Sequence, residues 1–299
     1  MSEFFRPPDG WLDVPDAVAA VAEVIPCGWF GDTEAGADDS ALPKAVYLWD
    51  AARKVLGGLL PPRNQGQVGS CVSFAAARAI EYTMLSEIAR GEPEVFCTIA
   101  TEPIYAGARV EVGGGKLRGD GAFGAAAALW VKDWGVLSRE YHGAYDLTAY
   151  DEIRCREWGR NGCPDVLESV AKLHPVNGIT RIKNWGDAMR ALANGYGISL
   201  CSNQGFAMTR DANGFARSSG RWAHAMCLCG YQTGAKEGGR IDNSWGASAH
   251  TGPLGAGDPG PEGFWASAEV IDNMLGSGDC WAFSAFTGFP KRTIDWGNL

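Results

Sequence analysis

Apolar residues follow two different periods along the chain, one in each half. Between residues 70 and 88, apolar positions recur every three or four residues, which is the spacing of one face of an α-helix. A second helix is predicted over about residues 123–134. Later, short apolar runs at 198–201, 223–231 and 239–243 are separated by Gly, Asn and Ser, as is typical of β-strands. This order predicts an α+β fold with a cleft between two subdomains.

Residues 1–41 differ from the rest because they are rich in proline, glycine and acidic residues. One short apolar run, at 17–25, is compatible with a helix or a strand. We therefore divide the chain into an N-terminal arm or short pro-segment, residues 1–41, and one domain, residues 42–299. The helical half of that domain is predicted at about 42–175 and its β-rich half at about 176–299.

The composition restricts the class of protein. The chain has 299 residues, of which 46% are hydrophobic and 20% charged, so it has enough apolar surface to form a core. The formal net charge of −9 argues against a nucleic-acid partner. Apolar runs fall short of the ~18 residues of a membrane helix, so no membrane insertion is expected. No secretory signal is visible at the start, which favours a location in the cytoplasm or in a phage particle.

Cysteine and histidine are present without the spacing of a metal site. The nine cysteines are an odd, scattered set, which favours reduced thiols over a disulfide framework. The four histidines lack zinc-ligand spacing, so no metal is expected. The glycine-rich stretch at 113–121 is a weak nucleotide signal, and we interpret it as a surface loop.

Cys71 and His224 are the candidates for nucleophilic chemistry. Ser70 is a predicted helix N-cap, which places Cys71 in the first turn. There the helix dipole and the first N–H groups stabilise a thiolate. A cysteine nucleophile also needs a base, and His224 lies on an alternating, strand-like run. Taken alone, His224 would equally be a hydrogen-bonded core histidine.

Three segments, in order, resemble the papain/cathepsin-like family of cysteine peptidases. Residues 64–74 read Asn-Gln-Gly-Gln-Val-Gly-Ser-Cys-Val-Ser-Phe and resemble the family's active-site segment. Residues 224–231, His-Ala-Met-Cys-Leu-Cys-Gly-Tyr, are similar to its histidine strand, and residues 242–246, Asp-Asn-Ser-Trp-Gly, to its Asn-Ser-Trp-Gly segment. The interval from cysteine to histidine is roughly 150 residues, as is typical of the family. The resemblance covers about residues 42–285 and implies a papain-like fold of a divergent, bacterial or phage type.

The resemblance implies four catalytic roles. Cys71 would be the nucleophile and His224 the general base and acid. Asn243 would orient the imidazole. Gln65 would donate its side-chain amide to the oxyanion, where preorganised donors are needed; without the resemblance it would be an ordinary turn residue. No cofactor is implied, because thiolate–imidazole chemistry needs no metal.

Supporting residues are present, together with departures from the family pattern. The resemblance implies that Trp245 shields the histidine–asparagine hydrogen bond, while Gly69 and Ser70 lead into the nucleophile. The usual tryptophan after the nucleophile and the usual cysteine before it are valines, Val72 and Val68. An acidic residue before the histidine is replaced by Ala223, and an insertion at 247–263, which contains His250, is positioned to cover the site.

Three functions are compatible with these residues. The first is a thiol endopeptidase or amidase that hydrolyses protein or peptide substrates. The second is a papain-fold structural or assembly protein, such as a phage-particle component, in which cleavage is dispensable or limited to self-processing. That protein would dock to a larger assembly through residues 1–41. The third is acyl transfer to an amine, which uses the same nucleophile.

Overall fold

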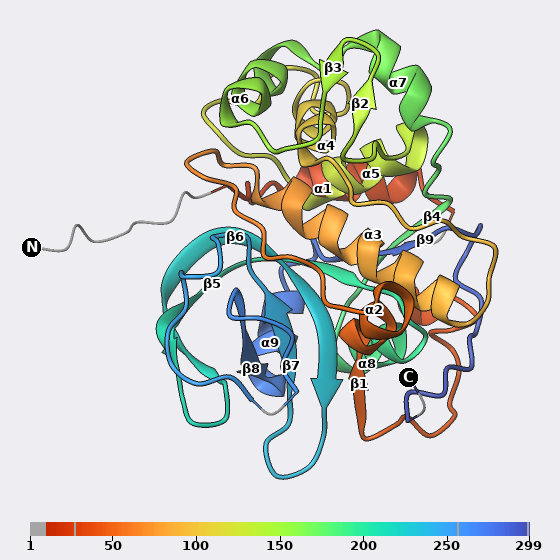
Figure 1. Ribbon diagram of the computed structural model, residues 1–299, viewed down its shortest axis with the longest axis vertical. Helices are drawn as coiled ribbons and strands as arrows, with labels where there is room; N and C mark the ends of the chain where they lie inside the picture. The colour runs from red at the N-terminus through yellow and green to blue at the C-terminus, as the bar shows by residue number, and fades with distance from the viewer. Residues whose placement is uncertain (1–9, 27, 256, 298) are drawn as a thin grey trace, which may run out of the picture.

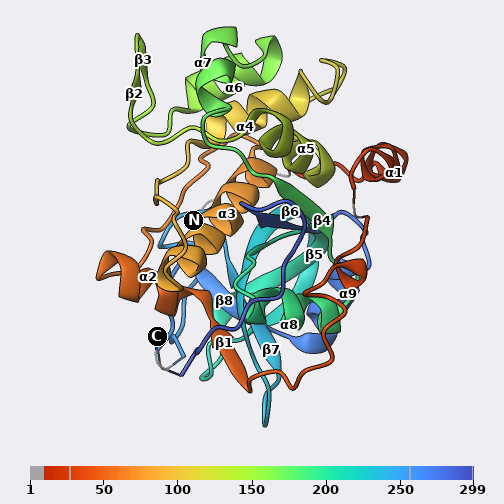
Figure 2. The ribbon, with the colours of Figure 1, turned by 90° about the vertical axis from the view of Figure 1, so that its right-hand side faces the viewer.

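One long helix, α3 (Cys71–Ala89), lies between a group of helices and a β-sheet (Figure 1). The computed structural model describes residues 10–26, 28–255, 257–297 and 299. Helices α4 to α7 gather at one end of the molecule, and strands β5 to β8 occupy the other (Figure 1). The small β2–β3 hairpin projects from the helical end, away from the sheet (Figure 2). The fold is therefore α+β, with helices and strands in separate regions.

Most α-helices of the described residues lie before residue 172, and two later ones pack beside the sheet. Two predicted helices are confirmed as α3 and α5, and the ambiguous run at 17–25 lies largely in a helix, α1. The helices besides α3 are α1 (Pro15–Glu23), α2 (Leu48–Leu56), α4 (Thr101–Arg109), α5 (Gly124–Trp134), α6 (Glu152–Asn161), α7 (Asp165–Ala171), α8 (Trp185–Ala193) and α9 (Ala268–Leu275), with a 3-10 turn η1 (Phe30–Asp32).

In the described part of the chain, seven strands form one antiparallel sheet in the order β4-β9-β5-β6-β7-β8, with β1 also paired to β6. The three predicted strand runs lie within or overlap β5, β6 and β7. The strands are β1 (Ala45–Tyr47), β2 (Tyr141–His142), β3 (Tyr145–Asp146), β4 (Gly178–Arg181), β5 (Ile198–Arg210), β6 (Ala216–Gln232), β7 (Gly238–Asp242), β8 (Gly263–Ser267) and β9 (Trp281–Ser284).

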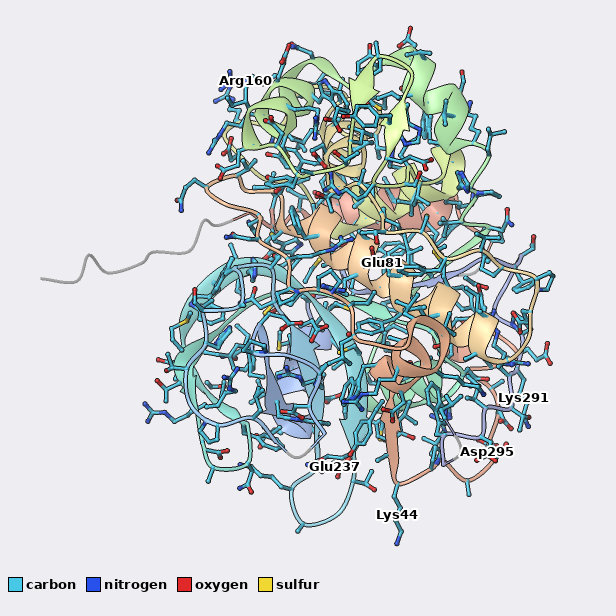
Figure 3. All side chains as sticks on the ribbon, in the orientation of Figure 1. Lys44, Glu81, Arg160, Glu237, Lys291 and Asp295 are labelled. Atoms are coloured by element: carbon cyan, nitrogen blue, oxygen red, sulfur yellow. The ribbon has the colours of Figure 1, made fainter. Side chains whose placement is uncertain are left out.

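Helix α3 is buried on nearly every face, because it contacts helices on one side and strands β5, β6 and β9 on the other. Its alanine-rich sequence suits this position, since small side chains let neighbouring elements approach closely. The helix also buries charged residues, among them Arg78 and Glu81. Figure 3 shows Glu81 near the centre of the molecule.

A buried ionic cluster joins α3 to the end of β7. Glu81 pairs with Arg63 and, at 3.6 Å, with Arg78. Arg78 in turn lies 4.0 Å from Asp242, which also accepts a 2.8 Å hydrogen bond from the Tyr82 hydroxyl. Removing one partner from such a cluster typically costs about 3–5 kcal/mol, because a buried charge is left uncompensated. The cluster therefore fixes the end of β7 against α3.

The described part of the N-terminal arm packs on the domain. Buried apolar side chains occur along it, including Val18 and Val21 on α1 and Phe30 and Ala35 farther on. Helix α1 contacts α5. Ahead of α1, Trp11 pairs with Ala122 in a parallel bridge, which joins the arm to the segment just before α5.

Candidate active site

Cys71 is the first residue of α3 and is completely buried. Ser70 occupies the N-cap position as predicted, but the prediction that its side chain caps the helix is wrong. Its hydroxyl lies 3.4 Å from the Tyr150 hydroxyl instead, because the tyrosine reaches in from the loop before α6. The Ser70 hydroxyl therefore does not offset the positive end of the helix dipole, which lies beside the Cys71 thiol.

His224 lies on β6 opposite Ser202 of β5 and is 1% exposed. Its Nε2 lies 2.8 Å from Asn243 Oδ1. Burial lowers the pKa of His224 to about 4, and the hydrogen bond to Asn243 acts in the opposite direction. Nδ1 has no hydrogen-bond partner among the described residues. In this state the imidazole is neutral at pH 7, with a proton on Nε2 and a lone pair on Nδ1.

The amide of Asn243, directly after β7, has its orientation set by two neighbours. Its Oδ1 accepts the backbone N–H of Ser244 at 2.8 Å, and a backbone N–H can only donate. Its Nδ2 lies 3.0 Å from Nε2 of His250. The amide oxygen must therefore face His224, so the structure brings together the predicted base and the residue predicted to orient it.

Trp245 covers that hydrogen bond from one side. Its ring stacks on His224 with 4.3 Å between centroids and 26° between planes. Trp222 packs against Trp245 at 4.7 Å in an edge-on arrangement. Because Trp245 is only 5% exposed, the ring excludes water from the face of the imidazole that it covers.

Gln65 is completely buried and is held by the segment that follows Asn243. Its backbone N–H donates to the Ser244 carbonyl at 2.8 Å, and its Oε1 accepts the Ser244 hydroxyl at 2.6 Å. Its Nε2 donates to the Val68 carbonyl at 2.8 Å. A primary amide has two N–H hydrogens, so this bond uses one of them. The other is the hydrogen that an oxyanion would need.

The thiol of Cys71 is covered by residue 10 of the N-terminal arm. A Cβ atom at Gly10 would lie 2.8 Å from Cys71 Sγ and 2.7 Å from the Gly69 carbonyl oxygen, so only glycine fits. The backbone N–H groups of Gly10 and Trp11 both donate to the carbonyl of Ala223 at 2.9 Å. Since Ala223 precedes His224, one residue of the arm contacts both the predicted nucleophile and the strand of the predicted base.

The arm is also held from the helical side. The Ala122 N–H donates to the Gly10 carbonyl at 3.0 Å, and the Leu12 N–H donates to the Ala122 carbonyl at 2.9 Å. Residues 113–120 form the expected surface loop, whereas Ala122 just beyond it is buried. Backbone hydrogen bonds thus tie this part of the arm both to the strand of His224 and to the segment before α5. The sequence alone did not point to Gly10 or Trp11, since a Pro- and Gly-rich stretch carries no periodic signal.

Within the described residues, the 247–263 insertion reaches the site through His250, whose Nε2 lies 3.0 Å from Asn243 Nδ2. Four backbone carbonyls of the insertion accept hydrogen bonds from the Arg210 guanidinium, which holds the insertion beside β5. This position brings His250 behind Asn243. Burial, followed by the charges of Arg210 and Arg240, lowers the pKa of His250 to about 3. His250 therefore stays a neutral acceptor.

We expect His250 to position Asn243, so that its replacement lowers kcat about fivefold with little change in KM. The reason is that one hydrogen bond of about 1 kcal/mol orients the amide. The measurement is the kinetics of His250→Leu on a peptide that the chain hydrolyses. His250→Gln, which restores an acceptor, should recover most of the rate. Wild-type kinetics for His250→Leu would contradict this role.

The other described cysteines are unsuited to nucleophilic attack at neutral pH. Burial is the largest cause of a raised thiol pKa in every one of them, and it makes the thiolate unfavourable. These residues are Cys97, Cys155, Cys163, Cys201, Cys227, Cys229 and Cys280. Cys71, at a helix N-terminus beside the histidine strand, is the candidate that remains among the described thiols.

The described residues offer neither a metal cluster nor a membrane-spanning helix. Within the part of the chain that the structure describes, no group of three or more His, Cys, Asp or Glu side chains is arranged to hold a metal ion. Among the described helices, none combines the length and the apolar character needed to cross a membrane.

Comparison with known proteins gives matches in fold. No family model matches the sequence, and no curated protein matches it. Among solved structures, procathepsin B S9 from Trypanosoma congolense is 13% identical with a TM-score of 0.57, over 96% of this chain and 87% of that one. Xylellain, a cysteine protease from Xylella fastidiosa, is 18% identical with a TM-score of 0.53, over 93% and 91%. Procathepsin L2 from the larval midgut of Tenebrio molitor is 14% identical with a TM-score of 0.55, over 92% and 77%.

These neighbours are papain-like cysteine proteases, and this chain has their mixed helix and sheet fold. The α+β, papain-like fold predicted from the sequence is confirmed. At these identities the likeness establishes the fold, and the chemistry has to be argued from the residues of the site.

Proposed function

We propose that this chain is a thiol peptidase that hydrolyses peptide bonds with Cys71, His224, Asn243 and Gln65. The observation that carries the proposal is the 2.8 Å contact between His224 Nε2 and Asn243 Oδ1. With Nε2 engaged in this way, the Nδ1 lone pair of His224 is left to act as a base. His224 follows Ala223 on β6, and the Ala223 carbonyl accepts the N–H of Gly10, the residue that covers Cys71. Nucleophile, base and orienting group are the three parts that such a reaction needs.

The proposed reaction has two steps. His224 Nδ1 takes the thiol proton, and Cys71 Sγ attacks the peptide carbonyl carbon to form a tetrahedral oxyanion. That oxyanion accepts hydrogen bonds from the second N–H of the Gln65 amide and from the Cys71 backbone. His224 then protonates the leaving amine, and a thioester remains. Water, deprotonated by His224, hydrolyses the thioester and regenerates the thiol.

We further propose that residues 1–41 act as a closing arm, so that the present structure corresponds to a latent form. Gly10 packs against Cys71 Sγ so closely that a Cβ would not fit between them, and its N–H donates to the carbonyl of Ala223, the residue before His224. The apolar side chains along the described arm are engaged with the domain itself. This supports a closing role over the alternative in which the arm docks to a larger assembly.

A second candidate is a papain-fold assembly protein in which cleavage is dispensable or limited to self-processing, as in a phage particle. The specific observation in its favour is that the thiol is completely buried. An epoxide inhibitor of thiol proteases separates the two functions. The peptidase proposal expects it to modify Cys71 in the chain once the arm is displaced, and to stop casein hydrolysis. No modification of Cys71 in that opened chain would favour the assembly protein.

Gln65→Ala is expected to lower kcat about 10²-fold and to change KM much less, because the amide acts on charge that develops in the transition state. Steady-state kinetics on any hydrolysed peptide provide the measurement. Gln65→Glu is a matched variant that keeps the shape and removes the amide donor, and it should behave similarly. An effect confined to KM would instead assign Gln65 to substrate binding.

A further inference from the structure

The side chain of Trp11 fills a pocket next to the candidate nucleophile. Trp11 follows Gly10, which contacts Cys71, and it is only 3% exposed. Its indole Nε1 donates to Asp279 Oδ2 at 2.7 Å. Asp279 is 1% exposed and lies two residues before the start of β9. A buried carboxylate thus binds the side chain of Trp11, the residue that follows Gly10 in the arm.

The domain supplies three of the hydrogen bonds that this carboxylate receives. The backbone N–H groups of Gly124 and Ala125, at the start of α5, donate at 2.6 and 2.7 Å, and Trp281 Nε1 donates at 2.7 Å. An ionised carboxylate accepts about four hydrogen bonds. Trp11 therefore supplies the fourth, from the arm. When the arm leaves, Oδ2 loses a donor.

The start of α5 packs closely against Asp279, and the carboxylate can accept one further hydrogen bond. A Cβ at Gly124 would lie 2.8 Å from Cys201 Sγ and 2.9 Å from Asp279 Oδ1, so only glycine lets α5 begin this near. Burial raises the pKa of Asp279 to about 6, and the hydrogen bonds that the carboxylate receives act in the opposite direction. With three donors fixed in the domain, a single further N–H completes the site.

We propose that this pocket selects peptide substrates that carry tryptophan next to the residue lying over Cys71, and that Trp11 imitates such a substrate. The proposal rests on the proposed peptidase function. The aromatic ring fills the space now taken by Trp11, and the indole N–H replaces the donor that Asp279 lost. A ring without that N–H leaves one lone pair of this buried carboxylate without a donor, which costs roughly 10- to 100-fold in affinity.

Binding without catalysis is the first test. The chain carrying both Trp11→Ala and Cys71→Ala empties the pocket and prevents turnover. Calorimetry then compares acetyl-Gly-X-Leu-Asp amides in which X is tryptophan, benzothienylalanine, phenylalanine or arginine. Benzothienylalanine has the shape of tryptophan with sulfur in place of N–H. The tryptophan peptide should bind roughly 10- to 100-fold more tightly than the two rings that lack the donor.

Three results would overturn the proposal: equal binding of tryptophan and benzothienylalanine, tighter binding of arginine, or no binding of the tryptophan peptide at millimolar concentration. Asp279→Asn in the same background should reduce the preference, but the ring comparison does not depend on that variant folding. Hydrolysis is measured separately, in the Trp11→Ala chain with longer peptides. There, a kcat/KM favouring tryptophan over phenylalanine supports the proposal, and equal values overturn it. Tight tryptophan binding without hydrolysis of any peptide would refute the peptidase function and leave the pocket's selectivity standing.

Discussion

Replacing Cys71 by alanine is expected to lower the rate of peptide hydrolysis by at least about 10⁴-fold, because the atom that forms the covalent intermediate is removed. The substitution removes one buried sulfur at the start of α3 and no hydrogen bond that fixes His224 to Asn243. The fold should therefore persist. The measurement is hydrolysis of casein or a labelled peptide by chains that carry Trp11→Ala, with and without Cys71→Ala, and circular dichroism checks folding.

Cys97→Ala is the matched control for that experiment. Cys97 is partly exposed, unlike the other described thiols, and burial still raises its pKa to about 12. Hydrolysis should remain at the level of the parent chain. If Cys71→Ala retains more than a small fraction of the activity, the nucleophile has been assigned wrongly, whatever the fold.

Trp11→Ala is expected to increase both hydrolysis and alkylation of Cys71, by about 10²- to 10³-fold where the closed form dominates. Truncation of a buried tryptophan typically costs about 3–5 kcal/mol, and the arm also loses its hydrogen bond to Asp279. Because Trp11 belongs to the arm and no side chain of the domain changes, the substitution destabilises the docked state of the arm and not the fold of the domain. The rate of iodoacetamide labelling at Cys71, followed by peptide mapping, measures the opening without any substrate.

Glu23→Ala provides the control, because Glu23 is an exposed residue on α1 of the same arm. It should leave the labelling rate unchanged. A denatured sample must show that Cys71 is fully alkylatable in both variants. Equal labelling of Cys71 in wild type and Trp11→Ala would mean that the arm does not control access to the thiol.

The fold and much of the site could be predicted because the informative residues are contiguous. The segment before Cys71, the strand of His224 and the turn of Asn243 each carry a local pattern, and their order is preserved. The structure then brings His224 and Asn243 within hydrogen-bond distance. It also attaches Gln65 to Ser244. Each of these positions needed only short-range information.

Other parts of the site depend on contacts between distant segments. Trp11 and Asp279 are separated by 268 positions, and Asp279 stands in a Gly-Ser-Gly-Asp stretch that looks like an ordinary turn. His250 lies in an insertion with no periodicity. Neither residue carries a local signal, because its importance arises from the residue that it meets. The burial of α3 is also underestimated by the sequence pattern. Its sequence shows an apolar stripe on one face, but in the structure the helix is buried on nearly all sides.

The arm that covers Cys71 is part of the same chain and is anchored by α1 only a few residues beyond Leu12. Its effective concentration at the cleft is therefore on the order of millimolar, and it does not fall on dilution. A substrate competes with a tethered ligand, so its apparent KM rises in proportion to the stability of the closed form. A single chain break between Leu12 and Pro15 would turn this unimolecular closure into an ordinary bimolecular equilibrium. Dilution would then open the cleft.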